Sequence, residues 1–188
     1  MDDEVLGKKV CIYGIDPGTT CLGNGIITVD PLTFEIVEME AFTINAGKLP
    51  LSDWNIGLYG ERFARIIAIT DHLSMYLKQY NPVSITCESP YFNHLHPSAY
   101  GPLVEVITSV RRTIYDWNKW IAMQSVDPTT VKKTVKAKGT KKPDMTEALL
   151  QIPEFKLIDV ESLDEHSIDG LAIAYYQYLK LRAQRYGS

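Results

Sequence analysis

Three short segments near the N-terminus carry the hydrophobic pattern of β-strands. Residues 8–16 form an apolar run with β-branched side chains, residues 23–29 form a second run, and residues 34–44 alternate between apolar and polar positions. Short runs of this kind, bounded by turn residues, are typical of strands. Three of them in quick succession with short connections predict an antiparallel meander.

Further along the chain the apolar positions recur every three or four residues, as they do in amphipathic helices. The recurrence predicts one long helix, which Asn81-Pro82 ends, and a second helix after a loop rich in Pro, Tyr, His and Asn. Asp127 before Pro128 is a helix-start signal, since Asp caps a helix and Pro suits its first turn. The expected elements after the meander are helix 56–80, strand 83–88, loop 89–101, helix 103–120, strand 121–126 and helices 128–136, 143–150 and 165–185.

Composition is ordinary for a globular protein: 45% of the 188 residues are hydrophobic and 22% are charged. We expect one domain, residues 1–188, and no membrane association, since no apolar stretch approaches the ~20 residues that a span needs. The N-terminus is acidic and lacks the features of a signal peptide, which predicts a cytoplasmic location. Three cysteines without a CxxC pair argue against structural zinc and a disulfide framework, and Cys11 and Cys87 are expected in the core.

Two acids close apolar strands: Asp16 ends the first strand and Glu88 ends strand 83–88. If these strands are neighbours in one sheet, both acids emerge at the same end of it. His166 and Asp169 are spaced i, i+3, which places them on one face of the terminal helix. Each residue taken singly has a simpler explanation, as a turn cap, a strand end or a polar residue in a first helical turn. Together they could hold hard cations, which prefer oxygen ligands and which in pairs support phosphodiester cleavage.

A basic segment, residues 132–142, holds six of the 19 basic residues and no acid, although the net charge is −4. Clustered lysines can neutralise nucleic-acid phosphates, while a solvated charged loop is the alternative. Tyr91 and Phe92 follow Glu88 and could stack on an unpaired base, or pack under the loop. The candidate DNA-binding residues are Tyr91, Phe92, Lys132, Lys136, Lys138, Lys141 and Lys142, with Lys132 and Lys136 expected on one face of helix 128–136.

Four motifs in this order resemble the RuvC-type Holliday junction resolvases of the RNase H-like superfamily. They are GIDPGTTCLGNGII at 14–27, Glu88 with Tyr91, VKKTVKAKGTKK at 131–142 and HSIDGLAIAYY at 166–176. The resemblance implies an α/β, RNase H-like fold: a five-stranded mixed sheet in the order βββαβαβα, with helices on both faces.

The resemblance also implies the site. Asp16, Glu88 and Asp169 match three metal-binding acids of the family, and His166 stands at a fourth position where members carry Asp or His. Lys132 stands where the family has a functional lysine, and a second family lysine falls near Lys142. The implied cofactor is Mg²⁺, or Mn²⁺, with two ions in each active site. All four residues of the site are therefore catalytic candidates.

The implied activity is cleavage of branched DNA, especially four-way junctions, in DNA recombination and repair. Because a junction has two equivalent strands to cut, a two-fold homodimer is expected, with helix 103–120 as a candidate interface. A phage-encoded member would act in the host cytoplasm. Three alternatives remain: a nuclease acting more broadly on flaps, Y-junctions and forks, a non-catalytic junction-binding protein, and an actin-like phosphotransferase. The sequence GIDPGTT resembles the first phosphate loop of such phosphotransferases, but they need two domains of this kind and the chain is too short for two.

Overall fold

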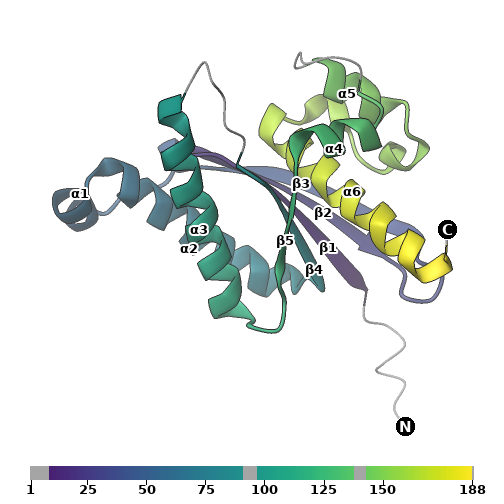
Figure 1. The fold of residues 1–188 in the computed structure, drawn as a ribbon, viewed down its shortest axis with the longest axis horizontal. Coiled ribbons are helices and arrows are strands. Elements are labelled where there is room, and N and C mark those ends of the chain that lie inside the picture. The colour runs from purple at the N-terminus through teal and green to yellow at the C-terminus, as the bar shows by residue number, and fades with distance from the viewer. Residues whose placement is uncertain (1–8, 91–96, 138–142, 188) are drawn as a thin grey trace, which may run out of the picture.

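A five-stranded mixed sheet forms the centre of the computed structural model, which describes residues 9–90, 97–137 and 143–187 (Figure 1). The strand order is β3-β2-β1-β4-β5. β1 pairs antiparallel with β2, and β2 with β3, which confirms the predicted meander; β4 lies parallel to both β1 and β5. The strands are β1 (Val10–Pro17), β2 (Cys21–Val29), β3 (Ile36–Asn45), β4 (Ser84–Glu88) and β5 (Met123–Val126).

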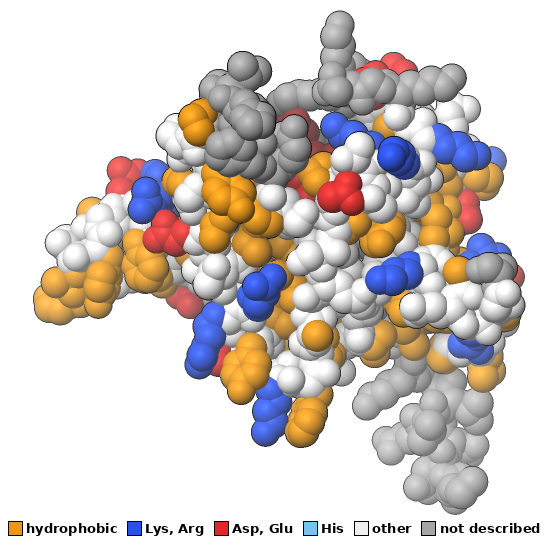
Figure 2. Space-filling view, in the orientation of Figure 1, with side chains coloured by type: hydrophobic (Ala, Val, Ile, Leu, Met, Phe, Trp, Pro, Cys, Tyr) orange, Lys and Arg blue, Asp and Glu red, His pale blue; other side chains and the backbone are white. Residues whose placement is uncertain are grey.

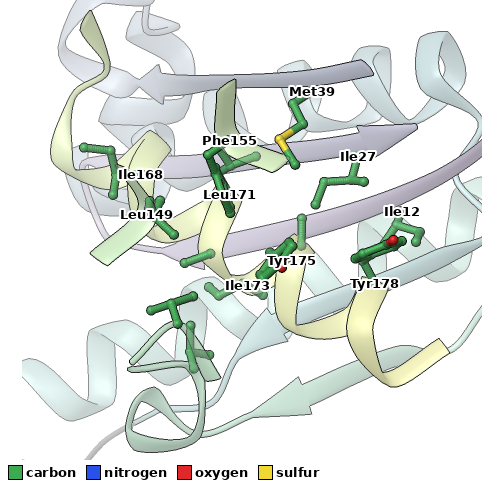
Figure 3. Close-up of a cluster of buried hydrophobic side chains, with 14 of the residues drawn as sticks. Ile12, Ile27, Met39, Leu149, Phe155, Ile168, Leu171, Ile173, Tyr175 and Tyr178 are labelled. Carbon is green, nitrogen blue, oxygen red and sulfur yellow. The ribbon is translucent and has the colours of Figure 1, made fainter. Parts of the chain in front are cut away.

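Helices cover both faces of the sheet, as expected: α2 and α3 lie on one side and α6, with α4 and α5, on the other (Figure 1). Alternation along β1 explains the two cores, since Ile12 packs under α6 (Figure 3) while Tyr13 and Ile15 pack under α2 and α3. Within the described ranges, no helix combines the length and apolarity that a membrane crossing requires. The helices are α1 (Asp53–Tyr59), α2 (Glu61–Tyr80), α3 (Tyr100–Trp117), α4 (Pro128–Thr134), α5 (Pro143–Leu150) and α6 (Glu165–Tyr186).

Three predicted helices differ from the structure in their bounds. The helix expected over 103–120 is α3, which begins at Tyr100 and ends at Trp117. The helix expected over 56–80 is divided at Gly60, whose φ of 83° interrupts the helical backbone between α1 and α2. α1 starts independently, at the Ser52 cap, and buries none of its side chains, so the predicted apolar stripe does not continue through it. The helix expected over 128–136 ends at Thr134, and Lys136 has a φ of 59°, so Lys136 does not share a helix face with Lys132.

Glycines bring α6 unusually close to the sheet. Gly14 and Gly25 face each other across β1 and β2, and a Cβ on Gly25 would lie 2.3 Å from Cα of Leu171. A Cβ on Gly23 would lie 1.9 Å from the carbonyl oxygen of His166. Only hydrogen in place of a side chain permits such an approach. The backbone of α6 therefore rests directly on the backbone of β1 and β2, and this fixes the height of the helix above the sheet.

Replacing Gly25 by Ala should lower the free energy of unfolding by about 3 kcal/mol, because the new methyl group would overlap the backbone of α6. Urea denaturation monitored by circular dichroism would measure the change. Gly57→Ala is the matched control: it lies in the exposed helix α1 with no atom within 4 Å of a new Cβ, and should be neutral or stabilising by up to about 1 kcal/mol. Equal stability of both variants would contradict the close packing of α6.

Candidate active site

Parallel pairing of β1 with β4 brings the two strand-end acids to the same end of the sheet. Ile15 of β1 is in register with Cys87 of β4, and Asp16 and Glu88 are the next residues along. Because Ile15 and Cys87 both belong to the core under α2 and α3, alternation turns the two acids toward the opposite face, which α6 covers. The sequence prediction that Asp16 and Glu88 emerge together is thus met by the structure.

The first turns of α6 supply the other two residues of the predicted site. Asp164 caps the helix by accepting a hydrogen bond from the backbone N–H of Ser167 at 3.1 Å, and the Thr43 hydroxyl donates to the same carboxylate at 2.6 Å. This cap anchors the start of α6 to β3. His166 then reaches Asp16: its Nδ1 donates to Oδ2 of Asp16 at 2.9 Å. The Asp16 side chain is only 14% exposed, against 41% for the His166 ring.

Glu88 and Asp169 lie partly buried among like charges. Burial, and then the charges of Asp16 and Asp169, raise the pKa of Glu88 to about 8. Burial, and then the charges of Asp16 and Glu165, raise the pKa of Asp169 to about 7. The hydrogen bond to Asp16 raises the pKa of His166 as well. All four residues that the sequence singled out therefore interact electrostatically at one place, although they come from three separate segments.

Lys132 of α4 is the only described residue of the predicted DNA-binding set that acts on this group of acids. Its positive charge opposes the upward shifts in the pKa of both Glu88 and Asp169. Lys136 is exposed beyond the end of α4. Basic side chains are visible over the α4 and α5 region in Figure 2. Tyr91, Phe92, Lys138, Lys141 and Lys142 lie outside the described residues.

The donor set fits a hard divalent cation. Among the described residues, no three His, Cys, Asp or Glu side chains stand close enough together to form a ready-made metal-ligand cluster. The carboxylates of Asp16, Glu88 and Asp169 nevertheless share a partly buried region, in which Asp16 and Asp169 raise the pKa of Glu88 and Asp16 raises the pKa of Asp169. A cation would relieve that repulsion and offer the oxygen ligands a common partner. Binding would therefore draw these side chains together.

Two features of this region were missed by the sequence prediction. Asp164 is not among the predicted site residues, yet it fixes the start of α6; an Asp directly before a helix is a cap signal that indicates this role. A cavity of about 570 Å³ adjoins His166, lined by residues of β3, α2 and α6. No sequence signal links its walls, because Thr43, His72 and His166 are far apart in the chain.

Without metal, the protein should lose a few kcal/mol of unfolding free energy as pH rises from about 4.5 to about 8.5. Glu88 and Asp169 bind protons more tightly when folded than when unfolded, so raising the pH favours the unfolded state. His166 acts in the same direction, because the stabilisation by its raised pKa is lost as it deprotonates. Urea unfolding in EDTA across this range measures the slope, which Glu88→Gln should flatten; stability that increases with pH would contradict the prediction.

Comparison with known proteins places this geometry in context. No known protein-family profile matches the chain. The crossover junction endodeoxyribonuclease RuvC of Cytophaga hutchinsonii is 22% identical over 171 residues, which cover 88% of this chain and 75% of that protein. RuvC of Christiangramia forsetii is 29% identical over 91 residues, 48% of this chain, and the match spans only 41% of that relative.

A solved structure gives a similarity in fold along nearly the whole chain. RuvC of Thermus thermophilus in complex with a Holliday junction substrate superposes with a TM-score of 0.66 at 18% identity, covering 92% of this chain and 96% of that one. The five-stranded mixed sheet is thus the RNase H-like sheet that the motifs predicted. In both sequence and fold, the chain is similar to the RuvC-type Holliday junction resolvases, as its four motifs indicated.

Proposed function

We propose that this protein is a metal-dependent endonuclease that cleaves phosphodiester bonds in branched DNA, with four-way junctions as its main substrate. The observation that carries the proposal is the meeting of Asp16, Glu88, His166 and Asp169 on a RuvC-like fold. Resolution of recombination intermediates is the corresponding biological role.

The three acids would hold two Mg²⁺ ions, or Mn²⁺ ions, in each active site. When bound, such a pair activates a water molecule and stabilises the departing 3′ oxygen of the cleaved strand. Asp16 is the central ligand of the three, because its charge acts on both Glu88 and Asp169. Partial burial of these carboxylates excludes bulk water and strengthens their interaction with a cation.

His166 is suited to proton transfer beside these acids. With Nδ1 donating to Asp16, Nε2 is the ring nitrogen left to accept a proton from the attacking water. The contact with Asp16 stabilises the imidazolium that results, since it raises the pKa of the ring. Asp16 thereby has two tasks, as a ligand and as the residue that orients the His166 ring.

DNA binding would centre on the basic segment that begins in α4. Lys132 already acts on the acids, so it can contact a phosphate at the cleavage site. Lys136, Lys138, Lys141 and Lys142 would extend this contact along the strand, and Tyr91 or Phe92 would stack on an unpaired base at the junction centre. A two-fold homodimer, with α3 at its interface, would supply the second active site that symmetric cleavage needs.

Asp16→Asn should lower the rate of junction cleavage by at least about 10³-fold while leaving junction affinity within a few-fold of wild type. The change removes one negative ligand charge but keeps the shape of the side chain. Cleavage of a labelled four-way junction, with gel-shift binding in parallel, measures both quantities. Asp71→Asn, an exposed acid on α2, is the control and should cleave normally. Full cleavage by Asp16→Asn would overturn the assignment, and flap and linear duplex substrates would show how selective the enzyme is for junctions.

His166 also stands at the fourth metal-binding position that the resemblance implies. His166→Asp should therefore retain cleavage and lower the ratio of the Mn²⁺-supported to the Mg²⁺-supported rate by about fivefold, since a carboxylate suits Mg²⁺ better than an imidazole does. The same variant should also lose the part of the pH–rate profile that reports His166. Initial rates at matched concentrations of the two ions test this. An unchanged metal ratio together with an unchanged pH profile would exclude His166 from both ligation and proton transfer.

A further inference from the structure

The cavity beside His166 lies at the edge of the sheet, between the end of β3, the outer side of α2 and the start of α6. Its volume of about 570 Å³ falls within the range of about 300–1,000 Å³ that is usual for small-molecule sites. His166 belongs to its wall and also hydrogen-bonds to Asp16. The His166 side chain therefore links the cavity to the group of acids.

One side of this cavity is apolar and rigid. Ile44 and Leu49 line it, together with Tyr76, whose ring packs against Phe42 with 4.3 Å between the ring centroids. Tyr76 also stacks near Tyr80, so neighbouring aromatic residues hold its ring in place. A flat, apolar ligand face would meet a fixed surface here.

The other side carries hydrogen-bonding groups. The Nδ1 of His72 bonds to the carbonyl oxygen of Ala68 at 2.9 Å, so this nitrogen is the donor and Nε2 remains as an acceptor. The exposed Lys48 side chain adds a cation at the rim. Thr43 is already occupied, because its hydroxyl donates to Asp164. An aromatic wall opposite a polar edge is the combination that recognises a planar heterocycle with polar substituents.

We infer that this cavity receives the unstacked nucleobase of the nucleotide next to the cleaved phosphate, with the base against Tyr76 and its polar edge toward His72. The inference rests on the proposed function and extends it to the recognition of the strand being cut. Bases at a branch point are the least costly to unstack, so the junction itself would supply a base that can enter. Binding of a base in the cavity would then make the cleavage rate depend on one nucleotide position, and on which base stands there.

Charge decides between a base and a phosphate as the occupant. Asp164 and Glu165 line the end of the cavity nearest α6, and their negative charges disfavour a phosphate inside it. A neutral base meets no such repulsion. Lys48, at the rim, is placed to neutralise the phosphate of the nucleotide that follows, outside the cavity.

The test is a scan of abasic sites. Four-way junctions carrying a single abasic nucleotide at each position around the main cleavage site are cut by the wild-type protein in Mg²⁺. An abasic nucleotide at one position adjacent to the cut should reduce kcat/KM by about fivefold or more, as expected for loss of one stacked base. Abasic nucleotides at the other positions should change kcat/KM little. The four natural bases placed at that position should also differ in rate.

Variants connect the effect to the cavity. His72→Phe keeps a ring but removes the Nε2 acceptor, and should reduce the differences between bases at that position; Leu49→Trp fills the cavity and should reduce the abasic effect itself. Lys78→Ala, on α2 but away from the cavity, should keep both effects. Thermal denaturation checks that each variant is folded, and if the variants unfold, the wild-type scan still decides.

The outcomes separate this inference from the proposed function. Cleavage of the intact junction with equal rates for every abasic position would overturn the cavity assignment and leave the nuclease assignment standing. If Leu49→Trp still cuts the abasic junctions at the same different rates as the wild type, base recognition lies elsewhere and the inference is overturned as well. No cleavage of any branched substrate by the wild-type protein would overturn both.

Discussion

Direct contact between the backbone of α6 and the backbones of β1 and β2 is the constraint on which the site depends. Ordinary side chains at Gly14, Gly23 and Gly25 would lift the helix away from the sheet, and with it the His166 ring that reaches Asp16. The same contact keeps Asp169 near enough to Asp16 and Glu88 for their charges to interact. Here the packing requirement and the chemical requirement coincide, since a small shift of α6 would separate the residues that must act together.

Electrostatics at this end of the sheet oppose folding. Three carboxylates in a partly buried region repel one another, and the single described lysine that faces them only partly compensates. The two apolar cores, one on each face of the sheet, provide the stability that offsets this repulsion. Strain of this kind is typical of functional sites, where groups are held in arrangements that a partner, here a cation, makes favourable.

The sequence was most informative where chemistry coincided with the end of an element. Asp16 and Glu88 close strands with clear apolar runs, and His166 and Asp169 lie in the first turns of a strongly patterned helix, so the sequence predicted all four as candidates. The structure brings them close enough to interact. The division at Gly60 was missed because apolar residues keep their helical spacing across it while the backbone does not. The end of α4 before Lys136 was missed for the same reason: a left-handed residue leaves no mark on a hydrophobic pattern.

Contacts between distant segments account for the rest of what the sequence did not show. The hydrogen bond from Thr43 to Asp164 joins residues 121 positions apart, and no local propensity predicts it. The cavity next to His166 has the same origin, since its walls come from β2, β3, α2, α6 and the segment after β3, which meet only after the sheet has formed. The similar RuvC structure shares the fold but does not predict these contacts, because at 18% identity it has few of the same side chains.

The hydrogen bond between His166 and Asp16 spans 150 positions of the chain. During synthesis, β1 leaves the ribosome long before α6 exists, and the sheet face that α6 later covers remains open until then. A partly synthesised chain therefore has the strand-end acids Asp16 and Glu88 but lacks His166 and Asp169. Any chemistry that needs all four side chains therefore has to wait until α6 has been made and has packed onto the sheet.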